Sequence, residues 1–203
     1  MIGIIDYHAG NPVSVLNMLT KAGADAFISS DTNQLAKASK FILPGVGTFS
    51  HAMEHLRECG IDTFLHQKIC VEKMPVLGIC LGMQLMTANS AEGAGRGLGW
   101  IDAETIKFNF SDHSIKVPHV GWNTVKIHRN SKLFEGIEEN ATFYFIHSYH
   151  LPYIATESIL GTTCYHSSFT SVIEAGNIIG IQFHPEKSHS NGLRLLKNFA
   201  LHY

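Results

Sequence analysis

The sequence lacks the features of several broad classes of protein. Among its 203 residues there is no run of eighteen apolar residues, and no basic segment followed by an apolar one, so neither a membrane span nor a signal peptide is predicted. Charge of one sign is also lacking. The 15 basic and 17 acidic residues leave a net charge of -2, which gives no indication of a nucleic acid or an anionic membrane as partner.

Cysteine is scarce, and its spacing does not suggest cross-links. The four cysteines (Cys59, Cys70, Cys80 and Cys164) form no CxxC pair or other metal-like spacing, which favours a reducing, cytoplasmic location. Histidine is frequent, with 13 residues, and we expect most of these to be surface or packing residues. The sequence therefore predicts no metal site and no cofactor.

The first ninety residues alternate between apolar runs and helical patterns. With 45% hydrophobic and 16% charged residues the chain is typical of a globular protein, and we expect residues 1–203 to form a single domain. The alternation predicts βαβ units and a parallel sheet with right-handed crossovers. Strands are predicted at 2–7, 24–28, 41–43 and 76–79, and helices from the Asn11 cap to Gly23, at 33–38 and across 50–71 with a break near Gly60.

After Ser90 the pattern changes to strands with no long helix between them. This predicts an antiparallel extension of the parallel sheet, so the fold class is α/β. A loop is predicted at 93–99, strands at 103–108, 123–127, 141–147, 158–164, 171–175 and 178–183, a hairpin turn at Gly176-Asn177, and a closing helix at 192–202.

Gly78-Ile79-Cys80-Leu81-Gly82 is the most informative segment. It follows a buried strand and has the small-x-nucleophile-x-small form of a nucleophile elbow, with cysteine as the nucleophile. Side chains two positions before and after Cys80 would clash in so sharp a turn. A helix predicted over 81–87 would place its positive end at the thiol and favour the thiolate. The alternative is that Cys80 is a small core residue, which is common after a strand.

His184 and Glu186 provide a base and a group to orient it. The apolar strand before them ends in polar residues, which places His184 at its carboxyl end, where open α/β sheets build their sites. Residues two apart in extended chain point the same way, so the carboxylate would fix the imidazole tautomer and stabilise the imidazolium. A surface pair is the alternative, but in combination with Cys80 we favour the catalytic interpretation.

Pro44-Gly45-Val46-Gly47 also directly follows a buried strand. Its glycines permit positive φ, so a backbone N–H of this loop can turn toward the nucleophile. Together with the N–H of Leu81 it would bind a tetrahedral oxyanion. A phosphate-binding loop is disfavoured because neither GxxxxGK[ST] nor GxGxxG is present.

These three motifs, in this order, resemble the class I (triad-type) glutamine amidotransferases, whose fold is flavodoxin-like, and the resemblance covers essentially the whole chain. Within that group, residues 118–123 (PHVGWN) and 144–149 (YFIHSY) are similar to the glutaminase subunit of imidazole glycerol phosphate synthase. In that family the subunit hydrolyses glutamine and passes ammonia to a separate (β/α)8-barrel synthase subunit, with which it forms a heterodimer in histidine biosynthesis.

The resemblance implies a role for individual residues. It makes Cys80 the nucleophile, His184 the general base and acid, and Glu186 its orienting group, with oxyanion N–H groups from Val46 and Leu81. Positions that hold the glutamine are matched by Gly47, Gln84, Glu92, Ser148 and Tyr149, and the partner-facing side by Pro118, His119, Trp122, Asn123, Tyr144 and Lys187.

Core packing is the alternative for Trp122 and Tyr144. The polar residues beside them (His119, Asn123 and His147) make a contact surface the favoured interpretation.

Two segments depart from the pattern of that subunit. The family commonly has Gly-Asn-Leu-Arg-Ser-Val near its start, whereas this chain has valine, Val13, in place of the arginine. Residues 99–103 (GWIDA) are more similar to a paralogous branch that supplies ammonia to a sugar-modifying amidotransferase in surface polysaccharide synthesis. That paralogue is the first alternative function. A non-catalytic redox sensor or chaperone with an elbow cysteine is a second, but it leaves the His184–Glu186 and PGVG segments unexplained.

Overall fold

Parallel strands form the centre of the main sheet. The computed structural model describes residues 1–93, 95–112, 114–153 and 156–203. Neighbouring strands pair in the order β2-β1-β3-β4-β14, and each of these pairs is parallel, as predicted. Their bounds are Ile2–Ile5 for β1, Ala26–Ser29 for β2, Lys40–Gly45 for β3, Val76–Cys80 for β4 and Ile178–Ile181 for β14.

The helices begin and end close to the predicted residues. The side chain of Asn11 caps the first helix by accepting the N–H of Ser14 at 3.1 Å, and Gly60, with φ of 65°, separates the third helix from the fourth. The bounds are Pro12–Lys21 for α1, Thr32–Leu35 for α2, Phe49–Glu58 for α3, Ile61–His66 for α4 with a π-helical continuation over Gln67–Val71, Leu81–Leu85 for α5 and His189–His202 for α6.

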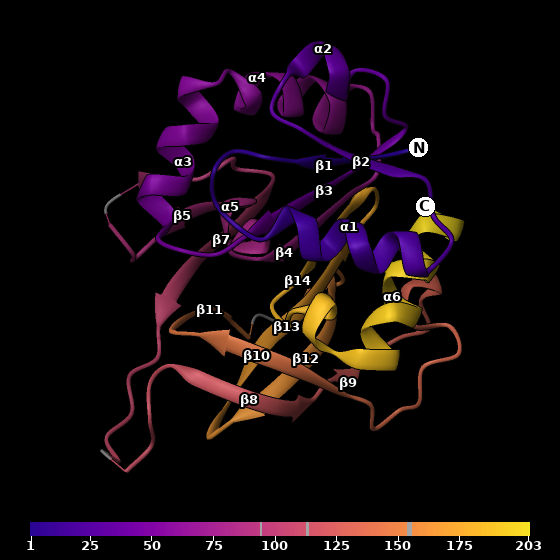
Figure 1. Ribbon diagram of the computed structural model, residues 1–203. Helices are drawn as coiled ribbons and strands as arrows, with labels where there is room; N and C mark the ends of the chain where they lie inside the picture. The colour runs from indigo at the N-terminus through magenta and orange to yellow at the C-terminus, as the bar shows by residue number, and fades with distance from the viewer. Residues whose placement is uncertain (94, 113, 154–155) are drawn as a thin grey trace.

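The helices cover both faces of the parallel sheet, and each face has its own apolar core. On one face α1 and α6 lie together, with Leu19 and Phe199 fully buried against the sheet (Figure 1). On the other, α3 and α4 bury Leu56 and Leu65. Because both faces are covered, the central strands are apolar along their length, which is why continuous apolar runs predicted them.

An antiparallel extension continues the sheet beyond β14, as the sequence predicts. β13 pairs antiparallel with β14 through a turn at Gly176, where φ is 62°. Strands β5, β6 and β11 were not predicted, and β6 lies within the segment predicted as a loop. The bounds are Thr87–Ser90 for β5, Gly95–Arg96 for β6, Ile101–Lys107 for β7, Lys126–Ile127 for β9, Tyr149–Pro152 for β11, Ile159–Tyr165 for β12 and Ser167–Ala175 for β13.

Strands β8 (His119–Thr124) and β10 (Thr142–His147) form a separate antiparallel ribbon beside the main sheet (Figure 1). The strand predicted at 123–127 therefore has the wrong bounds, because pairing with β10 moves its start back to His119. In this register His119 lies opposite His147, and Trp122 opposite Tyr144. One face of the ribbon is buried, and the other faces solvent.

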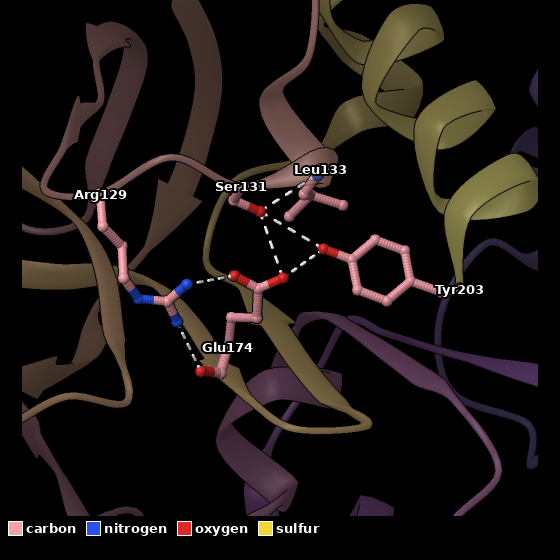
Figure 2. Close-up of polar contacts among 5 residues, drawn as sticks. All are labelled: Arg129, Ser131, Leu133, Glu174 and Tyr203. Atoms are coloured by element: carbon pink, nitrogen blue, oxygen red, sulfur yellow. Dashed lines mark hydrogen bonds and ion pairs between the residues drawn. The ribbon is translucent and has the colours of Figure 1, made fainter.

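The C-terminal residue is fixed to the antiparallel extension by a partly buried polar network (Figure 2). Arg129 donates to a side-chain oxygen of Glu174 at 2.7 Å and to its carbonyl at 2.9 Å. The hydroxyls of Tyr203 and Ser131 meet the other carboxylate oxygen of Glu174. Burial and this carboxylate raise the pKa of Tyr203 to about 12, so the phenol remains a hydrogen-bond donor and holds the end of α6 in place.

Within the described ranges, no helix is both long and apolar enough to cross a membrane. The four cysteines are all free thiols.

Candidate active site

Cys80 occupies the sharp strand-to-helix turn that the sequence predicts. Its φ of 53° and ψ of -107° are unusual for a residue with a side chain, which marks the turn as strained. A Cβ at Gly82 would lie 1.8 Å from the carbonyl oxygen of Leu43, and one at Gly78 would lie 2.8 Å from the backbone of Gly82. Glycine is required at both positions because the turn brings the backbones of β3, β4 and α5 into contact.

The helix after the elbow is shorter than predicted. It ends at Leu85 rather than Thr87, because the Thr87 hydroxyl donates to the carbonyl of Gln84 at 2.7 Å and the chain continues into β5. The helix still begins directly at Leu81. Its first backbone N–H groups have no partner within the helix, and Cys80 is the residue directly before them.

His184 follows β14, the strand beside β4, so its imidazole comes to the same sheet edge as Cys80. Its Nδ1 lies 2.7 Å from Oε1 of Glu186, and both side chains are almost fully buried. Burial lowers the pKa of His184, but the combined effect of Cys80 and Glu186 outweighs burial and raises it to about 10. The pair therefore stabilises an imidazolium beside the sulfur.

Nε2 of His184 is buried without a hydrogen-bond partner in the described part of the chain. This is the ring nitrogen that Glu186 leaves free. A buried polar atom without a hydrogen bond lowers the stability of the folded protein. An unpaired nitrogen at this position beside Cys80 suits a group that exchanges a proton with a reacting molecule.

A pocket of about 340 Å³ brings together most of the residues that the sequence singles out. Cys80 and His184 lie in its wall, and Glu186 stands behind His184. Ile146, for which no role was predicted, also lines the pocket, as does His147, which the sequence associated with a contact surface. The other predicted residues in its lining are Val46, Gly47, Leu81, Gln84, Glu92, Pro118, Ser148, Tyr149 and Lys187.

The segment 44–47, whose first two residues end β3, is anchored on one side and open on the other. The Tyr7 hydroxyl donates to the Pro44 carbonyl at 2.7 Å, and a Cβ at Gly45 would lie 2.7 Å from the backbone nitrogen of Gly82. Gly47 has φ of 110°, yet a Cβ there would meet nothing within 4 Å. The Val46 peptide thus lies between a tightly packed glycine and a glycine in open space.

Two buried glutamines form a hydrogen-bonded pair beside Cys80. Gln84 donates to the Tyr149 carbonyl at 2.8 Å and to the side-chain oxygen of Gln182 at 3.0 Å. The amide nitrogen of Gln182 lies 3.6 Å from Sγ of Cys80. Sequence reasoning gave no role to Gln182, which is fully buried. Its position as the one polar side chain in the apolar segment 178–183 was a signal that could have identified it.

Glu92 reaches the pocket from the segment after β5. Its Oε2 accepts the backbone N–H of Phe49 at 3.0 Å, and so caps α3, whose own N-cap residue Thr48 makes no side-chain bond. The carboxylate is therefore held at the pocket wall by the start of a helix.

The residues predicted to face a partner divide between two environments. Trp122 is 47% exposed, and Lys187 is exposed with its Nζ 5.6 Å from the centre of the Tyr144 ring, so these residues reach the surface. The placement of His119 at a contact surface is wrong. His119 is 3% exposed, because alternation along β8 turns it to the inner face of the ribbon, and His147 is likewise buried.

The comparisons with known proteins agree with this geometry. Residues 4–203 match the family described as glutamine amidotransferase class-I. The chain belongs to the class I glutamine amidotransferases. Curated relatives of this amidotransferase include imidazole glycerol phosphate synthase subunit HisH 2 of Methanococcus maripaludis, 49% identical over 98% of both chains, and the protein of that name from Pseudomonas aeruginosa, 44% identical over 98% of both. A crystal structure titled glutamine amidotransferase shares the fold, with a TM-score of 0.75, 17% identity and 98% coverage of both chains.

We predict that acid destabilises this amidotransferase through its buried histidines. Burial lowers the pKa of His119 and His150 to about 4 and that of His147 to about 3. In the unfolded chain the histidine pKa is near 6.5, so below that pH the unfolded chain binds more protons than the folded one. The contribution of these histidines to the free energy of unfolding is therefore fully present above about pH 6.5 and is lost as the pH falls toward 4. Each histidine contributes up to about 1.4 kcal/mol per pH unit in that range, which urea unfolding at a series of pH values would measure.

His150→Phe provides the control for this prediction. The His150 ring stacks on Phe108 with centroids 4.0 Å apart, so phenylalanine keeps the contact and removes one titrating group. We expect the variant to show a shallower loss of stability between pH 6 and 4. An unchanged slope would mean that the ring is already protonated in the folded protein.

Proposed function

We propose that this amidotransferase is the glutaminase subunit of an imidazole glycerol phosphate synthase, and that residues 1–203 act as one glutamine amidotransferase domain. It hydrolyses glutamine to glutamate and ammonia, and delivers the ammonia to a (β/α)8-barrel synthase subunit of histidine biosynthesis. The names of the curated relatives support the pathway. The observation that carries the chemistry is the strained Cys80 in one pocket with the His184–Glu186 pair.

The residues of the pocket suit amide hydrolysis through a thioester. The Cys80 thiolate attacks the side-chain amide carbon of glutamine, and the carbon–nitrogen bond breaks as His184 gives its proton to the leaving ammonia. His184 then takes a proton from water, which attacks the thioester and breaks the carbon–sulfur bond. Glutamate leaves, and the thiolate and imidazolium are restored. The N–H groups of Val46 and Leu81 bind the oxyanion in both steps.

The rest of the pocket suits the polar groups of a glutamine substrate. The carboxylate of Glu92 offers a counter-charge for its α-ammonium group, because only one of the oxygens is used by the Phe49 N–H. Gly47, Gln84, Ser148 and Tyr149 complete the binding wall.

The exposed face of the β8–β10 ribbon is proposed as the docking surface for the synthase subunit. Val120, Trp122 and Ile146 are 52%, 47% and 39% exposed, and together they form an apolar face on neighbouring strands. The face is continuous with the pocket, because Ile146 belongs to both and Pro118 and Lys187 also line the pocket. A partner seated there would cover the pocket mouth, where ammonia is released.

The paralogous glutaminase of a sugar-modifying enzyme remains the second candidate. It is favoured by the segment Gly99–Ala103 and by Val13, an exposed apolar residue where the histidine-pathway subunit commonly has arginine. Neither position lines the pocket. The two candidates thus share the glutaminase chemistry and differ in the partner.

We predict that the isolated chain is a slow glutaminase, and that the synthase subunit with its acceptor bound raises the rate by about 10²–10³, the value of one oxyanion donor. The glycines that flank Val46 let its peptide take either of two orientations, and docking would shift the population toward the donating one. Steady-state glutamate release, with the barrel subunit of the histidine pathway and separately with the sugar-modifying enzyme, tests both the activation and the choice of partner.

Gly47→Ala is the informative variant for this prediction. An added Cβ meets no neighbour, so the substitution perturbs the loop only through its φ of 110°. We expect it to bind the partner and lose most of the activation. Equal turnover with and without either partner would show that the oxyanion site is preformed, and absence of glutaminase activity in every mixture would contradict the proposed function.

A further inference from the structure

The inner face of the β8–β10 ribbon carries two buried histidines in direct contact. His119 of β8 lies opposite His147 of β10, with Nδ1 of His119 3.1 Å from Nε2 of His147. They are 3% and 6% exposed. The glutaminase chemistry uses neither ring, although His147 lines the pocket.

The hydrogen bonds of these rings have a single possible direction. Nδ1 of His147 lies 2.8 Å from the Tyr149 carbonyl, which can only accept, so this nitrogen carries the proton. The buried ring is neutral, and its Nε2 is therefore an acceptor for Nδ1–H of His119. Nε2 of His119 in turn accepts from the side-chain amide of Asn123, 3.3 Å away. Both histidines are thus neutral Nδ1–H tautomers.

The Tyr149 carbonyl connects this chain to the nucleophile. It also accepts from Gln84, which donates to Gln182, whose amide faces Sγ of Cys80. The contacts Asn123–His119–His147–Tyr149–Gln84–Gln182–Cys80 therefore run without a gap from the ribbon to the sulfur.

The ribbon also contacts the catalytic residues through its backbone. The Tyr144 carbonyl accepts the N–H of His184 at 2.9 Å, and Sγ of Cys80 lies 3.9 Å from the Ile146 carbonyl.

Among the described residues, β8 and β10 pair only with each other and not with the main sheet, so contacts outside a strand ladder, the His119–His147–Tyr149 bonds among them, hold the ribbon against the pocket. Along β8, His119 points inward while its neighbour Val120 is exposed. A displacement of the ribbon by anything bound to its outer face thus moves the donor for the Tyr149 carbonyl.

We propose that His119 and His147 are positioning residues that fix the Tyr149 carbonyl, and through Gln84 and Gln182 the nucleophile, so that the position of the ribbon sets the geometry of the substrate pocket. This inference rests on the proposed glutaminase function. The outer face of the ribbon binds the synthase subunit, and the histidines of the inner face transmit the position of the ribbon to the substrate pocket.

Kinetics of His119→Phe test the coupling. Phenylalanine retains an aromatic ring against Phe145 and Tyr165, on which His119 stacks, but cannot donate to His147. We expect a raised KM for glutamine and at least about a tenfold loss of the activation by the synthase subunit, as for one buried group left unpaired. Binding of that subunit is expected to be unchanged. His119→Gln, which can both donate and accept, is expected to restore part of the activation.

His150→Phe is the matched control. His150 is as buried as His147 and packs on the same Phe108 ring, but it lies outside the hydrogen-bond chain. The synthase subunit should therefore activate the His150→Phe variant as much as the parent protein. Full activation of His119→Phe would overturn the inference. The parent protein in the same assay tests the proposed function separately, because a parent without glutaminase activity contradicts that function whatever the variants do.

Nitrogen NMR of the unsubstituted protein tests the inference independently of any change in folding. Both His119 and His147 are expected to show the neutral Nδ1–H tautomer at pH 7. With an Nε2–H tautomer, His119 could not donate to His147, or His147 could not donate to the Tyr149 carbonyl. That result in either ring would contradict the positioning role.

Discussion

Cys80→Ala is expected to remove glutamine hydrolysis, with a loss on the order of 10⁶-fold, the effect of deleting a nucleophile from a catalytic triad. The fold should survive. Alanine keeps the Cβ that the turn already accommodates at φ of 53°, and the change removes a single buried sulfur atom. Glutamate release from the variant and the parent, with thermal unfolding of both, measures the two effects.

Cys59→Ala and Cys164→Ala are the controls, since both thiols are exposed and neither lines the pocket. They should be as active as the parent protein. A folded Cys80→Ala that still hydrolyses glutamine would exclude the thioester mechanism, and loss of activity in a folded Cys59→Ala would move the nucleophile elsewhere.

His184→Ala and Glu186→Gln are expected to separate the base from its orienting group. Without His184 no group donates a proton to the leaving ammonia or accepts one from water, and we expect a loss on the order of 10⁶-fold. Glutamine at 186 still hydrogen-bonds to Nδ1 but cannot stabilise the imidazolium, which predicts a smaller loss of about 10⁴-fold. Single-turnover rates of thioester formation and hydrolysis would show both steps slowed.

The buried position of Glu186 makes this comparison decisive. Oε1 of Glu186 accepts from His184 at 2.7 Å, and Oε2 has no partner in the described part of the chain. In Glu186→Gln the amide nitrogen can take the place of Oε2, so no other hydrogen bond is lost. If Glu186→Gln were as active as the parent, another group would have to orient His184.

Local sequence was sufficient for the elbow and the parallel sheet. Cys80 could be identified because only glycine fits at positions 78 and 82, and close backbone packing therefore leaves a mark on the sequence. The strands of the parallel sheet are covered on both faces, which imposes continuous apolar runs. His184 and Glu186 could be identified for a related reason, since polar residues that end such a run lie at the edge where sites form.

The bounds of the ribbon and of α5 depended on contacts that are remote or specific. The start of β8 at His119 follows from its pairing with β10, and α5 ends early because the Thr87 hydroxyl binds the carbonyl of Gln84. Strand pairing is set by partners far away in sequence, so a pattern of polar and apolar residues alone does not fix its register.

By itself, the sequence identified Cys80 and His184 as candidates and predicted the parallel sheet, because steric and burial constraints act there on individual positions, whereas the other predicted residues of the pocket came from the family resemblance. Only the tertiary structure decided that His119 faces inward, that Gln182 meets the sulfur, and that His147 and Gln84 both donate to the Tyr149 carbonyl between the ribbon and Cys80. The physical reason is that the direction of a hydrogen bond and the side of a strand that is buried depend on partners from distant segments, which no local pattern of residues specifies.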